Sequence, residues 1–117
     1  MSDLKQLATQ YFEMFSNKDL TGLSGIFTDE VNLRDWERSA TGKVGMMAAA
    51  TSIFDAVNTI IVTPLSLYEE NSTVVAEIEI LVNNEIKLLV VDVITFEGDK
   101  ISVSEPIKDN NEKVICR

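Results

Sequence analysis

Residues 88–96 read LLVVDVITF, a run with the composition of a buried β-strand that is interrupted by one carboxylate. Side chains alternate between the two faces of a strand. Over residues 86–96 the face that carries Asp92 is otherwise apolar, and on the opposite face Leu89, Val91 and Val93 are apolar as well. Burying an unpaired charge costs several kcal/mol. Asp92 therefore needs a partner, a raised pKa or a functional role.

The second half of the chain has the pattern of an antiparallel meander. Strands are predicted at residues 59–68, 74–82, 86–97 and 100–107. Pro64 predicts that the first of these strands lies at an edge of the sheet or contains a bulge. Asn83 and Asn84, and then Gly98 and Asp99, predict tight hairpins between consecutive strands.

The first half is predicted to be helical except for one strand. Apolar residues recur with helical spacing over residues 3–15, 20–27 and 43–57, and a short strand is predicted at residues 31–36. Three helices with one strand between them, followed by a meander, indicate an α+β fold. We expect one domain over residues 1–117, in which a curved, mainly antiparallel sheet wraps around the helices.

The composition argues against several classes of partner. The net charge is −9, with 19 acidic and 10 basic residues, whereas nucleic acids and anionic membranes require clustered Lys and Arg. No apolar run approaches the ~20 residues that cross a bilayer, and the first residues lack the pattern of a signal peptide. The single cysteine, Cys116, fits a reducing compartment. We expect a cytoplasmic protein that binds neither nucleic acid nor membranes.

The absence of histidine limits the chemistry further. It removes His-dependent triads and most zinc sites, and we expect neither a metal nor an organic cofactor. Proton transfer near neutral pH would then depend on carboxylates or tyrosines with shifted pKa values.

Three side chains that can donate, accept or transfer protons are predicted to face one interior. Besides Asp92, Asp35 shares a strand face with Val31 and Leu33. Tyr11 lies within the apolar stripe of the first helix. We therefore expect these three residues to converge on one apolar pocket.

Four segments carry a resemblance to a known family: residues 11–31 (YFEMFSNKDLTGLSGIFTDEV), 33–36 (LRDW), 41–43 (TGK) and 90–101 (VVDVITFEGDKI). The chain resembles the NTF2-like, or SnoaL-like, superfamily of α+β cones, which includes the ketosteroid isomerases. The resemblance implies a cone of three helices on a curved sheet. It also implies that Tyr11 and Asp92 form an oxyanion hole and that Asp35 is the base that transfers the proton.

This resemblance suggests why a carboxylate would lie in an apolar strand. In ketosteroid isomerases an aspartic acid is kept neutral by its apolar site, so that it can donate a hydrogen bond to an oxyanion. Asp35 would remain ionised near the mouth of the pocket and remove a proton next to a substrate carbonyl. The implied activity is that of an isomerase or cyclase acting on an apolar carbonyl compound. We expect the pocket to be lined by Phe15, Trp36, Met47, Ala50, Phe54, Val90, Ile94 and Glu105.

Each of these residues also has a structural interpretation. Asp92 can pair with a lysine or with a backbone amide at a sheet bulge, and Asp35 can cap the loop before Ser39. Tyr11 can be a core tyrosine with a satisfied hydroxyl group. Glu105, beside Pro106, can lie at a solvated strand end.

Two further hypotheses concern the whole chain. The alternative function is a ligand-binding or assembly module that keeps the cone but lacks catalysis, since a fold alone does not determine activity. Because both faces of the longest strand are apolar, we also predict a homodimer that packs through the outer face of the sheet, with Val91 and Val93 in the interface.

Overall fold

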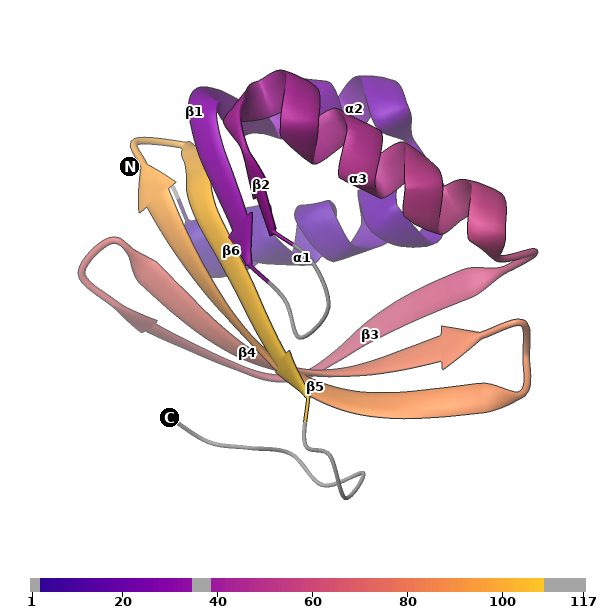
Figure 1. Ribbon diagram of the computed structural model, residues 1–117. Helices are drawn as coiled ribbons and strands as arrows, with labels where there is room; N and C mark the ends of the chain where they lie inside the picture. The colour runs from indigo at the N-terminus through magenta and orange to yellow at the C-terminus, as the bar shows by residue number, and fades with distance from the viewer. Residues whose placement is uncertain (1–2, 35–38, 109–117) are drawn as a thin grey trace.

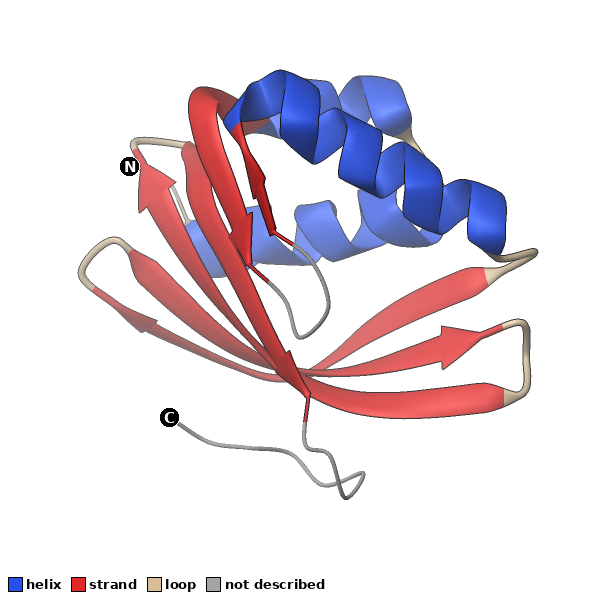
Figure 2. Ribbon diagram, in the orientation of Figure 1, coloured by secondary structure: helices blue, strands red, loops and turns tan. Residues whose placement is uncertain are grey.

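The chain folds into three helices that cover one side of a six-stranded sheet (Figures 1 and 2). The computed structural model describes residues 3–34 and 39–108. The elements are α1 (Leu4–Ser16), α2 (Leu20–Ile26), β1 (Phe27–Arg34), β2 (Ser39–Thr41), α3 (Gly42–Ala56), β3 (Ile60–Glu70), β4 (Thr73–Val82), β5 (Ile86–Glu97) and β6 (Lys100–Lys108). Within the described ranges, no helix is both long and apolar enough to cross a bilayer.

The strand order in the sheet is β2-β1-β6-β5-β4-β3. The meander from β3 to β6 is antiparallel, β2 pairs antiparallel with β1, and β1 pairs parallel with β6. Figure 1 shows that the sheet curves strongly and that the helices lie in its concave side. The α+β class, with helices on a curved and mainly antiparallel sheet, is confirmed.

Acidic side chains begin the first two helices. The Asp3 carboxylate accepts hydrogen bonds from the backbone N–H groups of Lys5 and Gln6, at 3.1 and 3.3 Å. Asp19 accepts in the same way from the N–H of Gly22, at 3.0 Å. These bonds satisfy N–H groups that have no partner within the helix, and they fix where α1 and α2 begin.

The end of α3 is held by groups from two distant segments. The Lys18 ammonium group donates to the backbone carbonyls of Phe54, Val57 and Asn58, at 3.0, 2.7 and 3.2 Å. Asn83, at the tip of the β4–β5 hairpin, accepts from the N–H groups of Asn58 and Thr59, at 2.6 and 3.2 Å. The end of α3, the β4–β5 hairpin and the loop after α1 are therefore joined by hydrogen bonds.

The predicted meander agrees closely with the observed strands. Pro64 lies in β3, which is an edge strand, and the β3–β4 register shifts between Pro64 and Ser66. The three-residue strand β2 was not predicted. The parallel pairing of β1 with β6 was not predicted either, since it joins segments that are distant in the sequence.

One irregularity changes which side chains of β6 face the helices. Thr95 pairs with Val103, but the next residue, Phe96, pairs with Ile101, so Ser102 is an extra residue on β6. Such a bulge reverses the alternation of faces beyond it. Ser104 and not Glu105 therefore points inward, contrary to the expectation that Glu105 lines the pocket.

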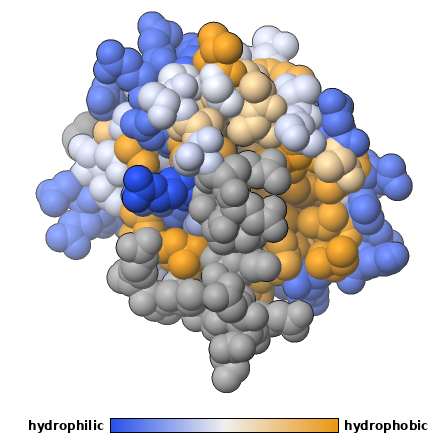
Figure 3. All heavy atoms as spheres, in the orientation of Figure 1, coloured by the Kyte–Doolittle hydropathy of each residue, from blue (hydrophilic) through white to orange (hydrophobic). Residues whose placement is uncertain are grey.

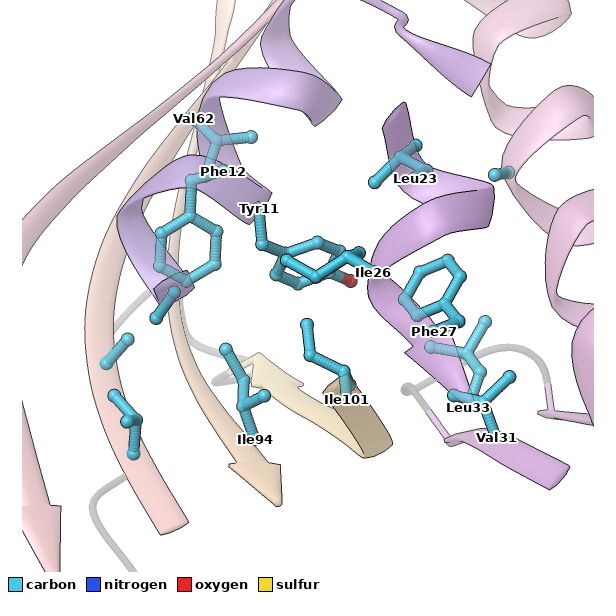
Figure 4. Packing of buried hydrophobic residues seen from close by; sticks show 14 of the residues in the cluster. Tyr11, Phe12, Leu23, Ile26, Phe27, Val31, Leu33, Val62, Ile94 and Ile101 are labelled. Atoms are coloured by element: carbon cyan, nitrogen blue, oxygen red, sulfur yellow. The ribbon is translucent and has the colours of Figure 1, made fainter. Parts of the chain in front are cut away.

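The core lies between the helices and the concave face of the sheet. Figure 4 shows the Tyr11 ring inside this cluster, among apolar side chains from helices and strands. The ring packs edge-on against Phe27 and Phe15, with centroid distances of 5.8 and 6.1 Å. Aromatic pairs at such distances add stability beyond their buried area, so Tyr11 is held firmly although its hydroxyl group is polar.

Candidate active site

A cavity of ≈190 Å³ lies between α1, α3 and the concave face of the sheet. Its lining is formed by Tyr11, Phe12, Phe15, Leu33, Met46, Ala50, Ile53, Val57, Ile60, Val62, Ile78, Ile80, Val82, Leu88, Asp92, Ser104 and Pro106. Seen from outside, apolar side chains gather where α3 faces the strands of the meander (Figure 3). The only groups in this lining that can donate or accept through a side chain belong to Tyr11, Asp92 and Ser104.

Asp92 projects into this cavity from the middle of β5. It lies between Ala76 on β4 and Pro106 on β6, and only 3% of the residue is exposed. Among the residues that the structure describes, no lysine or arginine forms an ion pair with it. The carboxyl group is therefore buried in an apolar setting without a described counter-charge.

Ser104 connects Asp92 to Tyr11. The Ser104 hydroxyl group lies 3.2 and 3.4 Å from the two carboxyl oxygens of Asp92 and donates to them. The Tyr11 hydroxyl group lies 3.3 Å from the same Ser104 oxygen, and either group can be the donor of that bond. Residues from α1, β5 and β6 thus form one buried chain of hydrogen bonds, which we call the Tyr11–Ser104–Asp92 chain.

The surroundings alter the acidity of both ends of this chain. Burial raises the pKa of Asp92 to about 7; the hydrogen bonds from Ser104 and from the backbone N–H of Glu105 oppose this rise, and the Glu105 charge adds to it. Burial, followed by the charge of Asp92, raises the pKa of Tyr11, against the effect of its Ser104 hydrogen bond. Near neutral pH Tyr11 is therefore a neutral phenol, whereas Asp92 exchanges between neutral and ionised forms.

The structure brings together only part of the predicted site. Tyr11 and Asp92 meet through Ser104, and Phe15 and Ala50 line the cavity beside them. The other predicted lining residues on described elements lie elsewhere: Phe54, Val90 and Ile94 are buried in the core, and Met47 packs half-buried against it. Asp35 and Trp36 lie outside the described residues.

Glu105 faces away from the cavity. It borders a shallow polar hollow at β1, β2 and β6, together with Asn32 and Arg34. Its backbone N–H nevertheless donates a hydrogen bond to Asp92. The structural interpretation of Asp92, a backbone amide near a sheet bulge, thus describes part of its environment.

Ser104 was missed in the sequence. Serine is common in strands and gives no pattern of its own, and the bulge at Ser102 places it on the face opposite to the one that simple alternation predicts. The available signal was indirect: Asp92 needed a partner, and the strand after the Gly98 hairpin was the nearest source of one.

The sequence of residues 8–104 matches the SnoaL-like domain. The chain belongs to the SnoaL-like domain family. The match covers α1 to β6 and includes all three members of the Tyr11–Ser104–Asp92 chain. No curated protein matches the sequence.

Solved structures with the same fold are distant in sequence. This SnoaL-like chain superposes on a candidate SnoaL-like polyketide cyclase of Shewanella putrefaciens with a TM-score of 0.83 and 14% identity, covering 96% of this chain and 93% of that one. TerC, crystallised with polyporic acid, gives 0.81 and 16%, covering 94% of each chain. A candidate ketosteroid isomerase of Kribbella flavida gives 0.79 and 11%, covering 90% and 76%. The fold is thus the NTF2-like cone that the sequence predicts.

Proposed function

We propose that this chain is a small-molecule enzyme that removes a proton next to a carbonyl group of an apolar substrate, in the manner of ketosteroid isomerases and SnoaL-like cyclases. The observation that carries the proposal is the buried Asp92 carboxyl group, which Ser104 holds in an apolar cavity. With a pKa raised to about 7, this carboxyl group is available as a neutral donor in the physiological range.

In the proposed step, the Asp35 carboxylate accepts a proton from the carbon next to the carbonyl group. The electron pair of the broken C–H bond moves toward the carbonyl oxygen and forms an enolate. The negative oxygen accepts a hydrogen bond from the Tyr11 or the Asp92 end of the Tyr11–Ser104–Asp92 chain, because charge that develops in a dry site gains much from fixed donors. Where a C=C bond is conjugated with the enolate, return of the proton from Asp35 to its far carbon gives isomerisation. Attack of the enolate carbon on a second carbonyl carbon gives cyclisation, in which that carbonyl oxygen becomes an alkoxide and takes up the proton from Asp35.

The shape and chemistry of the cavity support a small neutral substrate. A cavity of roughly 150 Å³ holds benzene, so ≈190 Å³ suits one or two rings. Its described lining carries no lysine or arginine that would favour an anion. The names of the Shewanella and Kribbella proteins, a cyclase and an isomerase, are consistent with a carbonyl substrate.

The test is exchange of the α-hydrogens of a ketone in D2O. We expect the wild-type protein to speed deuterium incorporation at C2 of 1-tetralone, a two-ring ketone, as followed by NMR. Asp35→Asn should lower the rate about 10²–10⁴-fold by removing the base, and Tyr11→Phe should lower it about 10–10³-fold by removing a donor. An exchange rate equal to that of buffer alone contradicts the proposal.

The alternative is a binding module without catalysis. It is favoured by one observation: the hydroxyl and carboxyl groups of the Tyr11–Ser104–Asp92 chain satisfy one another, as in a structural core cluster. Such a module would bind 1-tetralone, as judged by calorimetry, without any deuterium exchange. The two experiments together separate the two functions.

A further inference from the structure

The number of hydrogen-bonding protons in the Tyr11–Ser104–Asp92 chain depends only on whether Asp92 is neutral or ionised. Tyr11 and Ser104 each contribute one hydroxyl proton, and Asp92 contributes one only when it is neutral. The chain has two links, one between Tyr11 and Ser104 and one between Ser104 and Asp92. Each link uses one proton.

This count decides what the chain can offer to a ligand. When Asp92 is ionised, Tyr11 donates to Ser104 and Ser104 donates to the carboxylate, so both protons are used. When Asp92 is neutral, one proton is left over, and it can be donated into the cavity from either end of the chain. The same residues therefore accept hydrogen bonds in one state and offer one donor in the other.

We propose that Ser104, by joining Tyr11 to Asp92, makes the binding of a neutral carbonyl compound in this cavity dependent on the uptake of one proton. Ser104 acts here as a positioning residue, because it accepts the hydrogen bond of the Tyr11 hydroxyl group whenever Asp92 is ionised. The Tyr11 proton is then not available to a ligand. The inference rests on the proposed function in one respect, namely that the cavity is where the ligand binds. It deepens that function by assigning a single acceptor oxygen as the group that the site recognises.

Among the residues that the structure describes, one charged group outside the Tyr11–Ser104–Asp92 chain acts on the protonation of Asp92. This group is Glu105 on β6, and the charge of Asp92 in turn acts on Tyr11 of α1. On β4 the opposing residue is Ala76, and α3 lines the cavity with Met46, Ala50, Ile53 and Val57. Burial places the pKa of Asp92 at about 7, so the change of state falls within an accessible pH range.

The test compares two ligands of the same size. 1-Tetralone has one carbonyl oxygen, and tetralin is the same bicycle without it; neither titrates between pH 5.5 and 9. We expect the affinity for 1-tetralone to fall about tenfold or more as pH rises through about 7, since a buried carbonyl then loses its donor. The affinity for tetralin should stay constant. At pH 8, calorimetry in buffers of different ionisation enthalpy should show uptake of about one proton per 1-tetralone.

Two variants test whether the pH dependence of 1-tetralone binding comes from the Tyr11–Ser104–Asp92 chain. Asp92→Asn keeps the size of the side chain and cannot ionise, so its affinity for 1-tetralone should not change with pH. Ser104→Ala releases the Tyr11 proton from the chain, so at pH 9 this variant should bind 1-tetralone more tightly than wild type. A serine with only a structural role would weaken binding at every pH when replaced. The matched control is Ser102→Ala, because Ser102 donates to the Thr95 carbonyl at 3.1 Å and lies outside the cavity lining.

The inference is overturned if 1-tetralone and tetralin respond alike to pH, if neither binds, or if Ser104→Ala binds 1-tetralone more weakly than wild type throughout. Should Asp92→Asn fail to fold, the wild-type titration and Ser104→Ala still decide the question. Proton-linked binding of 1-tetralone without any deuterium exchange would support this inference while contradicting the proposed catalysis. Failure of the two proposals can therefore be told apart.

Discussion

At the scale of single residues, the burial of Asp92 makes the stability of the fold depend on pH. Its ordinary pKa is 3.8, and burial raises the pKa to about 7 in the folded chain. Between these values the folded state binds more protons than the unfolded state, so the free energy of unfolding falls as pH rises. The stabilising proton is fully present below pH 3.8 and is lost as pH rises through about 7.

The first prediction follows from this decrease of the free energy of unfolding with rising pH. Asp92→Asn should leave the free energy of unfolding nearly unchanged at pH 4 and raise it by up to about 4 kcal/mol at pH 8, because the variant has no carboxyl group to ionise. Urea unfolding of both proteins at pH 4, 6 and 8 measures this difference. A difference that is constant over this range would mean that Asp92 keeps its ordinary pKa.

The second prediction concerns the charge of Glu105, which adds to the raised pKa of Asp92. Glu105→Gln removes that charge and keeps the backbone N–H that donates to Asp92. We expect the pKa of Asp92 to fall by less than about one unit, as measured by an NMR pH titration of its carboxyl carbon. Glu97→Gln, at the exposed end of β5, is the matched control and should leave the titration unchanged. A pKa that rises in Glu105→Gln would contradict the assigned cause.

At the scale of elements, the long strands that end at turn residues could be predicted and the shortest strand could not. The bounds of β5 match the prediction, because its apolar run ends at hairpin residues on both sides. The strand β2 has three residues, too few for any periodicity, and it depends on pairing with β1. Because β2 forms only through this tertiary contact, no local sequence pattern predicts it.

The candidate site shows the same division. Asp92 could be predicted, because a single carboxylate in an apolar row requires an explanation, and Tyr11 could be predicted from its place on the apolar stripe of α1. Ser104 and Glu105 exchanged places in the prediction, because one extra residue at Ser102 reverses the faces of β6. Pro64 signals the irregularity in β3, but no proline marks the bulge at Ser102.

The third prediction tests the hydrogen bonds that connect the end of α3 to the β4–β5 hairpin. Asn83 and Asn84 both adopt positive φ, at 53° and 59°, so replacement by alanine strains the two positions similarly. The Asn83 side chain also accepts two backbone hydrogen bonds. Asn83→Ala should therefore lower the free energy of unfolding by about 1–3 kcal/mol more than Asn84→Ala does, as measured by urea unfolding. Equal losses would show that only backbone strain matters at this hairpin.

At the scale of the whole molecule, the outer face of the sheet has an apolar row without cover from the helices. Tyr68, Val75 and Val93 are paired across β3, β4 and β5 on the face opposite to Asp92, and Tyr68 is 57% exposed. Val91 was also predicted to lie in a dimer interface, but it is only 1% exposed within a single chain. Val91 is therefore too buried to contribute to a dimer interface, and we predict the contact at the row of Tyr68, Val75 and Val93 instead.

The last prediction is that two chains associate through the Tyr68–Val75–Val93 row, since joining two such rows removes apolar surface from water. Val93→Lys should weaken the dimer by at least about tenfold, because each interface would bury an ammonium group. Lysine is preferable to glutamate here, since Glu105 lies opposite Val93 and like charges in that position would destabilise the sheet. Val44→Lys is the matched control, because Val44 is 87% exposed on α3, away from the outer face. Light scattering over a range of concentrations gives the mass, and a monomeric wild-type chain, or equal dimerisation of the two variants, would exclude this interface.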